Sequence, residues 1–112
     1  MHMDLKELLD FIAWENNRIR KIIIKGYSKK EEIYLRVVKV MEELGEFCNE
    51  VIALNGAHRK GKQKKFKKDN KVDLSKEFAD VIFTILLVGD TLDIDIKKSL
   101  EDRMKNIKSR KY

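Results

Sequence analysis

The sequence predicts an all-α protein whose subunit resembles a four-helix bundle. The chain of 112 residues contains no proline and only five glycines, and 39% of its residues are charged. This composition favours long helices joined by few turns and does not favour a β-sandwich or barrel, which needs many turn residues. Apolar residues recur every three or four positions, and no stretch alternates as a strand would. The length suits one helical domain spanning residues 1–112.

The first two helices are expected over residues 4–24 and 28–54. Leucine and isoleucine recur at helical spacing in the first, and Gly26 is the expected stop signal. Ser28 followed by Glu31 is a capping-box pattern that starts the second helix. The second helix carries one apolar stripe that is expected to face the core: Val37, Met41, Leu44, Cys48 and Val51. Cys48 is therefore interpreted as a core residue and not as a catalytic thiol.

A lysine-rich connection follows at about residues 56–72. Between Arg59 and Lys71 the local charge is +7, which leaves about −1 for the rest of a chain of net charge +6. Loops of this length inside a compact domain are uncommon and are usually functional or disordered. Three interpretations stay open: a solvated loop, a lid that attracts anionic nucleotides, or a nucleic-acid site. The last is disfavoured because Phe66 is the one aromatic residue in the stretch.

The third and fourth helices are expected over residues 74–91 and 95–109. Asp73 or Ser75 is the candidate cap of the third helix, and Asp93 or Asp95 that of the fourth. Between Phe78 and Val88 the third helix is apolar on all sides except at Asp80 and Thr84. A helix that is apolar all round is expected to be buried all round. We therefore expect an oligomer, a homodimer or homotetramer, with the third helix buried at the interface.

Four acidic residues form the candidate functional site. Glu77 and Asp80 share one face of the third helix, and Glu43 and Glu46 repeat the same spacing on the second. Two antiparallel helices that each present two carboxylates would form a cage of hard oxygen ligands, which suits Mg²⁺ or Mn²⁺. Two other interpretations are a solvated acidic face and a salt bridge that neutralises Asp80.

The pattern Glu-Glu-x-x-Glu at 42–46 with Glu-x-x-Asp at 77–80 resembles the MazG-like, all-α nucleoside triphosphate pyrophosphohydrolase superfamily. The resemblance covers the chain from about Trp14 to Lys111. It implies that Glu43, Glu46, Glu77 and Asp80 bind magnesium, with Glu42 as a further catalytic residue that orients a ligand or activates water. The implied reaction cleaves an NTP or dNTP between the α and β phosphates, giving the monophosphate and pyrophosphate. A phosphoribosyl-ATP pyrophosphohydrolase of the same superfamily is the near alternative.

The resemblance also implies a basic segment near the C-terminus that binds the substrate phosphates. Its counterparts in this chain are Arg103, Lys105, Asn106 and Arg110, although Arg103 and Asn106 are three residues apart where the family has four. Nucleobase contacts are expected from Trp14, by stacking, and from Asn16 and Asn17, whose amides could read base edges.

The remaining features bear on compartment and on a non-enzymatic alternative. The lone Cys48 excludes an intramolecular disulfide framework and fits a cytoplasmic location. The charged N-terminus does not read as a signal peptide, and the apolar run around residues 81–88 is too short to span a membrane. A membrane is therefore not expected as a partner. Nucleic acid is an unlikely partner, because the lysine-rich stretch holds one aromatic residue. The alternative from another class is a helical oligomer that binds nucleic acid through the lysine-rich loop. Asp80 argues against it, because a pure binding module has no use for an acid in that apolar run.

Overall fold

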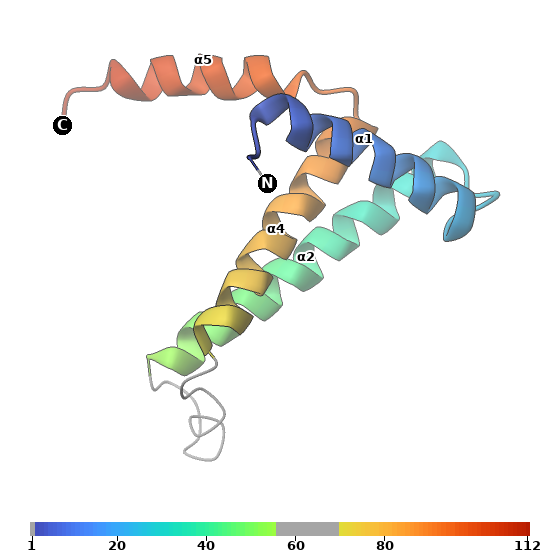
Figure 1. The fold of residues 1–112 in the computed structure, drawn as a ribbon, viewed down its shortest axis with the longest axis horizontal. Helices are drawn as coiled ribbons and strands as arrows, with labels where there is room; N and C mark the ends of the chain where they lie inside the picture. The colour runs from blue at the N-terminus through green and yellow to red at the C-terminus, as the bar shows by residue number, and fades with distance from the viewer. Residues whose placement is uncertain (1, 56–69) are drawn as a thin grey trace. The chain divides into compact units, whose positions relative to one another are not determined.

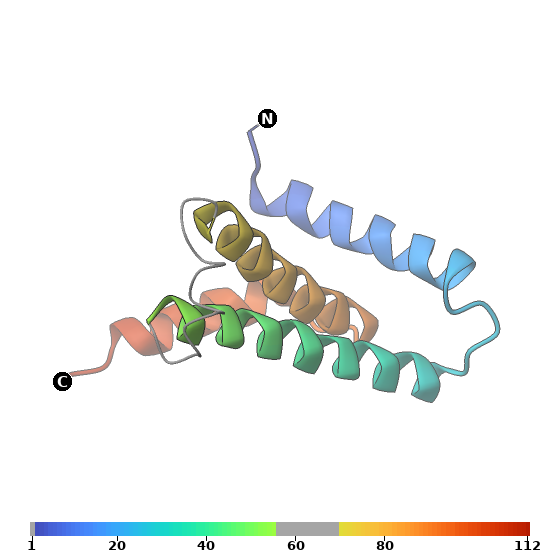
Figure 2. The same ribbon diagram turned by 90° about the horizontal axis from the view of Figure 1, so that it is seen from below.

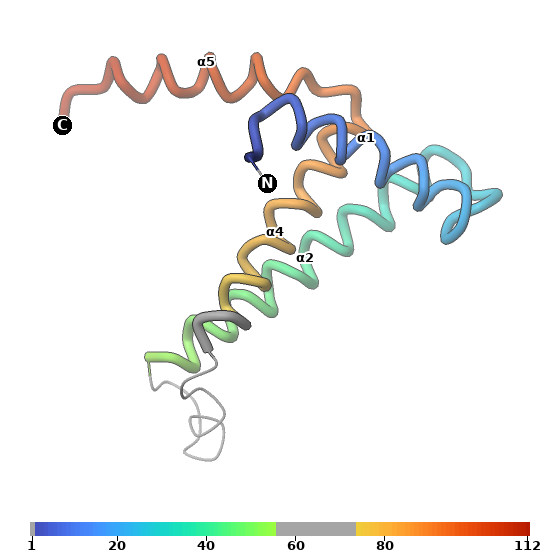
Figure 3. Tube along the Cα trace, viewed as in Figure 1, coloured from blue at the N-terminus to red at the C-terminus, as the bar shows by residue number. Residues whose placement is uncertain are grey.

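The computed structural model describes residues 2–55 and 70–112. Four helices and no strand occur over these ranges, and they are α1 (Leu5–Ile22), α2 (Lys29–Leu54), α4 (Asn70–Thr91) and α5 (Ile96–Lys108), shown as ribbons in Figure 1 and as a tube in Figure 3. The predicted all-α class is confirmed. Within the same ranges, no helix combines the length and apolar character that a membrane-spanning segment requires. The interpretations of the lysine-rich stretch at 56–69 fall outside the described residues.

Side-chain caps fix three of the helix starts where the sequence places them. The Asp4 carboxylate accepts from the Glu7 N–H at 2.8 Å. At Ser28 the predicted capping box is formed in both directions: the hydroxyl accepts from the Glu31 N–H at 3.1 Å, and the Ser28 N–H donates to the Glu31 carboxylate at 3.0 Å. That backbone hydrogen bond lowers the pKa of Glu31. Of the two candidate caps of α5, Asp95 is the one used.

The start of α4 differs from the prediction. The helix begins at Asn70, so neither Asp73 nor Ser75 is its cap. Residues 70–73 include no proline or glycine that would stop the helix, so it extends one turn further than the capping pattern indicates.

The described chain divides into two compact units, Met1–Ile33 with Leu86–Tyr112, and Tyr34–Ile85. Few hydrophobic side chains are fully buried in either: Ile12 and Ile24 in the first unit, Ala53 and Val81 in the second. Among the described residues, burial inside one chain therefore supplies only a small apolar core.

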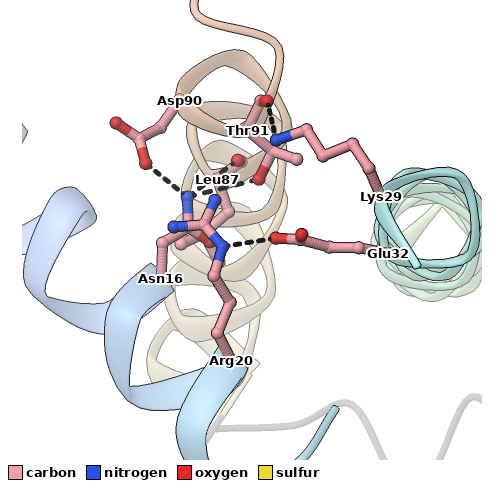
Figure 4. A network of polar contacts seen from close by, with 7 residues as sticks. All are labelled: Asn16, Arg20, Lys29, Glu32, Leu87, Asp90 and Thr91. Atoms are coloured by element: carbon pink, nitrogen blue, oxygen red, sulfur yellow. Dashed lines mark hydrogen bonds and ion pairs between the residues drawn. The ribbon is translucent and has the colours of Figure 1, made fainter. Parts of the chain in front are cut away.

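A buried amide joins α1 to the end of α4 in the first unit (Figure 4). Asn16 is 0% exposed, and its Nδ2 donates to the Leu87 carbonyl at 3.1 Å and to the Asp90 carboxylate at 2.6 Å. The Thr91 hydroxyl, also buried, lies 3.4 Å from the same nitrogen. A donor held among three oxygens fixes the orientation of the amide, because the flipped amide would point its oxygen at them.

Two cationic side chains complete this polar network. Arg20 Nε lies 2.6 Å from a Glu32 carboxylate oxygen, and the Glu32 side chain is 9% exposed. Lys29 Nζ donates to the Thr91 carbonyl at 2.8 Å, which satisfies one of the last carbonyls of α4. Polar contacts as well as apolar packing therefore hold the first unit together.

In the second unit α2 and α4 lie side by side and run in opposite directions, as Figures 1 and 2 both show. Phe47 and Phe78 meet edge-to-face at 5.9 Å between ring centroids. The residues of α2 on the side toward α4 include Val40, Glu43 and Phe47, all buried or half-buried.

The apolar stripe of α2 that was expected to form the core is exposed in the single chain. Val37 is 40%, Met41 60% and Leu44 45% exposed, and Cys48 is exposed as well. The placement of these residues in the subunit core is therefore wrong. Among the described residues of the second unit, α4 is the helix that packs against α2, and the side of α2 that carries Glu43 faces it.

Asp93 is the one non-glycine residue with positive φ among the described residues, at 57°. The left-handed region is strained for side chains with a Cβ and is relaxed for glycine. We expect Asp93→Gly to raise the free energy of unfolding by about 1 kcal/mol. Asp102→Gly, in the interior of α5, should lower it by a similar amount, roughly 1 kcal/mol. Urea unfolding of both variants checks this, and a loss of stability in Asp93→Gly would contradict it.

Candidate metal centre

Three carboxylates converge between the two helices of the second unit. Glu43 comes from α2 and Glu77 and Asp80 come from α4, and one oxygen of each lies within 4.8 Å of the others. Glu43 is buried at 8% exposure, while Glu77 and Asp80 are half-buried. The spacing of three residues puts Glu77 and Asp80 on the same side of α4, next to the buried Glu43.

Glu77 is the carboxylate whose environment is least favourable for its charge. Its Oε2 is buried and has no hydrogen-bond partner among the described residues. Burial raises the pKa of Glu77, and the nearby Glu46, Asp80 and Glu43 raise it further, while Lys76 opposes them. A buried oxygen without a donor costs free energy until a proton or a cation reaches it.

Two exposed lysines partly neutralise the cluster. Lys39 Nζ lies 3.2 Å from Glu43 and 3.6 Å from Glu42, and Lys76 Nζ lies 3.0 Å from Asp80. The pKa of each lysine is raised, above all by its hydrogen bond to Glu43 or Asp80. The lysine side chains are 56% and 70% exposed, so these ion pairs are surface pairs, typically worth roughly 0–1 kcal/mol.

The environment of Asp80 differs from the one predicted. Its side chain is 36% exposed and paired with Lys76, so it lies at the edge of the hairpin and not inside an apolar core. The sequence expectation assumed that α4 is buried on all sides, but Phe78, Ile82 and Ile85 are 56%, 41% and 48% exposed in the single chain. A salt bridge that neutralises a buried Asp80 was one of the open interpretations, and the structure shows a surface pair with Lys76 in its place.

The other two predicted acidic residues lie outside the converging group. Glu46 is exposed, although its charge contributes to the raised pKa of Glu77. Glu42 is exposed and its one ion pair is with Lys39. Their assignments as a fourth ligand and as a further catalytic residue stay predictions.

The donor set suits a hard divalent cation. Mg²⁺ and Mn²⁺ prefer carboxylate oxygens as ligands. The site offers three such oxygens within 4.8 Å of one another, and Glu77 also has a buried oxygen that no donor reaches among the described residues. Clusters of exposed acids also occur without any ion, and the two lysines show how this one is partly neutralised in the single chain.

Trp14 and Asn17, the residues predicted to contact a nucleobase, lie together on α1. With Arg18, Lys21 and Ile22 they line an open hollow of about 330 Å³. The Arg18 guanidinium lies 4.6 Å from the centre of the Trp14 ring, and Phe11 approaches the same ring at 5.8 Å. Trp14 is 54% exposed, so part of the ring is accessible although Arg18 covers one face of it.

The predicted phosphate contacts all lie at the C-terminal end of the chain. Arg103 donates to the Asn106 side-chain oxygen at 3.1 Å, and Arg110 lies 3.5 Å from the Tyr112 hydroxyl. Lys105 is exposed, as are the other three.

The sequence reasoning missed two residues of importance here. Lys39 precedes Glu43 by four residues, which is a recognisable helical ion-pair spacing. Asn16 was expected at a base edge but is fully buried, and nothing in the sequence signals its partners, which lie more than 70 residues away along the chain.

Comparison with known proteins adds no relative. No family model, no curated protein sequence and no solved structure matches the chain.

The raised pKa of Glu77 gives a pH prediction for the metal-free protein. A carboxyl whose pKa is higher in the folded state holds its proton longer there than in the unfolded chain. Stability should therefore fall as the pH rises from the ordinary glutamate value through the raised value. Glu77→Gln should remove that fall. Urea unfolding in EDTA as a function of pH measures the difference, and identical slopes in the two proteins would contradict the prediction.

Proposed function

We propose that the protein is a magnesium-dependent nucleoside triphosphate pyrophosphohydrolase that converts an NTP or dNTP to the monophosphate and pyrophosphate. The observation that carries the proposal is the convergence of Glu43, Glu77 and Asp80 around a buried Glu77 oxygen that lacks a hydrogen-bond donor. The resemblance of the two acidic motifs to the MazG-like superfamily supports the reaction class. The helical fold is compatible with it, but a fold alone does not assign a function.

Glu43, Glu77 and Asp80 would hold Mg²⁺ (or Mn²⁺), with Glu46 as the expected fourth ligand. When bound, the ion neutralises phosphate charge and activates water for attack on phosphorus. Glu42, exposed beside the cluster, is proposed to orient a ligand or to accept a proton from that water.

The chain's cations are proposed to bind the phosphates. Lys39 and Lys76 reach the carboxylates from outside as exposed pairs, so turning toward a substrate phosphate would cost each of them little. Arg103, Lys105, Asn106 and Arg110 are proposed as further phosphate contacts. The α1 hollow with Trp14 and Asn17 is proposed as the nucleobase site. The cytoplasmic homo-oligomer expected from the sequence belongs to the same proposal.

A substrate screen tests the proposed function. Purified protein is incubated with each common NTP and dNTP in the presence of Mg²⁺, and pyrophosphate and monophosphate are measured as products. We expect at least one nucleotide to yield the two products in equal amounts, and EDTA to stop the reaction. Release of orthophosphate instead would indicate cleavage at the γ position and would contradict the proposed reaction. No turnover of any nucleotide would contradict the function.

A further inference from the structure

The two lysines beside the carboxylate cluster contact acids that are more buried than the lysines themselves. The Glu43 side chain is 11% exposed, whereas its partner Lys39 is 56% exposed. Asp80 and its partner Lys76 show the same order, at 36% and 70%. In the i, i+4 ion pairs of α5, by contrast, more than half of every side chain is exposed. The cluster therefore has its acids inside and its cations outside, unlike an ordinary surface pair.

These lysines offset the repulsion that the cluster creates in the metal-free protein. The three converging carboxylates carry a charge of −3 when ionised, and Lys39 and Lys76 reduce it to −1. Burying the Glu43 carboxylate without a cation nearby would cost much more than leaving an exposed acid unpaired. The two ammonium groups thus act as counter-ions that belong to the chain itself.

The lysines do not satisfy every acceptor of the cluster. The Lys76 ammonium group donates its hydrogen bond to Asp80 at 3.0 Å. The buried Oε2 of Glu77 has no donor among the described residues. A cation bound among all three carboxylates would satisfy the oxygen that the lysines leave without a donor.

A divalent cation and the two lysines compete for the same carboxylates. With such an ion bound, the charge of the cluster and its lysines would change from −1 to +1, so both ammonium groups would be repelled. Release costs each lysine little, because exposed ion pairs are weak and water solvates the freed ammonium group. Metal binding therefore favours departure of Lys39 from Glu43 and of Lys76 from Asp80.

Helix geometry places the two lysines at opposite ends of the cluster. Lys39 precedes Glu43 by four residues on α2, and Lys76 precedes Asp80 by four residues on α4. Because α2 and α4 run in opposite directions (Figure 2), one lysine lies toward each end of the cluster along the hairpin. An anion that contacts both lysines must therefore carry charge along its length, as a chain of two or more phosphates does.

We propose that Lys39 and Lys76 are exchangeable counter-ions, which neutralise the carboxylates of the metal-free protein and move to a polyphosphate when a divalent ion binds. This inference rests on the proposed function and adds a coupling to it: the metal and the polyphosphate each raise the affinity of the site for the other by the same factor. Capture of a nucleotide by this site is therefore weak until the ion is present.

Isothermal titration calorimetry with Mg²⁺ alone, in a buffer without phosphate or nucleotide, tests the competition. We expect Lys39→Met and Lys76→Met each to bind Mg²⁺ about fivefold more tightly than the wild type, the factor by which a surface ion pair competes. Methionine keeps much of the apolar stem and removes the charge. Lys98→Met is the matched control: it removes the same charge from an ion pair of α5, and its Mg²⁺ affinity should stay at the wild-type value.

Amine labelling follows the lysines themselves. The wild type is treated with a trace of an acylating reagent, and the label at each lysine is measured by mass spectrometry. Adding Mg²⁺ should speed the labelling of Lys39 and Lys76 by about fivefold, and inorganic pyrophosphate added next should slow it again. Lys98, whose carboxylate partner lies outside the cluster, should be labelled at the same rate throughout.

The outcomes separate this inference from the proposed function. Unchanged Mg²⁺ affinity in both cluster variants, with unchanged labelling of Lys39 and Lys76, would overturn the counter-ion role and leave the proposed function standing. Release of the two lysines by Mg²⁺ in a protein that hydrolyses no nucleotide would support the counter-ion role and overturn the function alone. A wild type that binds no Mg²⁺ would overturn both.

Discussion

Asp80→Asn should lower Mg²⁺-dependent release of pyrophosphate by at least about 100-fold, because even groups that only support a metal ligand typically cost 10–100-fold when removed. The substitution keeps the shape of the side chain and removes its charge. Asp80 is one of the three residues whose oxygens converge within 4.8 Å, so the site would lose a third of its converging carboxylates.

The same substitution should have little effect on the metal-free protein. It removes a surface ion pair with Lys76, which contributes roughly 0–1 kcal/mol, and it also relieves repulsion with Glu43 and Glu77. A deeply buried salt bridge would behave differently, since stranding its cation costs about 3–5 kcal/mol. The variant should therefore unfold at nearly the wild-type temperature in EDTA.

Asp102→Asn is the control for this experiment. Asp102 forms the same kind of pair, with Lys98 four residues away at 2.9 Å, but lies on α5 outside the carboxylate cluster. Turnover should be unchanged in this variant. If Asp80→Asn keeps wild-type turnover, or if Asp102→Asn loses as much, the assignment of Asp80 to the site is wrong.

Asn16→Leu should lower the free energy of unfolding by about 2 kcal/mol, the cost of leaving buried polar groups without their partner. Asn16 is fully buried, and its amide is the donor to the Leu87 carbonyl and to the Asp90 carboxylate. Leucine has nearly the same size, so the loss should come from those oxygens and not from a cavity. Urea unfolding followed by circular dichroism measures it.

Asn17→Leu provides the comparison, because Asn17 is the next residue of α1 and is exposed. Its effect on unfolding should stay within about 0.5 kcal/mol, as for most surface substitutions. Equal losses in the two variants would show that the effect belongs to helix α1 in general. No loss in Asn16→Leu would contradict the role of the buried amide.

The fold was predictable wherever local chemistry decides the structure. Ser28 with Glu31 specifies the start of α2, and Asp95 that of α5, through side-chain hydrogen bonds to nearby N–H groups. The start of α4 was not predictable from capping residues, because nothing at 70–73 stops the helix. The apolar stripe at Val37 and Leu44 was recognised correctly as a stripe, but periodicity does not say which neighbour covers it.

The candidate site was predictable in part for similar reasons. The spacing of Glu77 and Asp80 places them on one side of α4, and the structure brings Glu43 to them. The contributions of Lys39 and Lys76 depend on long, flexible side chains that helical spacing permits but does not require. The buried structural role of Asn16 could not be predicted, because its hydrogen bonds join segments that are distant in sequence.

Melting of the wild-type protein as a function of Mg²⁺ concentration tests the metal centre most directly. An ion that binds the folded state alone stabilises it by about 2.7 kcal/mol at a hundredfold excess over its dissociation constant. We predict a saturable rise in melting temperature that is lost in Asp80→Asn and kept in Asp102→Asn. A wild-type melting temperature that Mg²⁺ and Mn²⁺ leave unchanged would contradict the account, and would show that the cluster of Glu43, Glu77 and Asp80 holds no divalent ion.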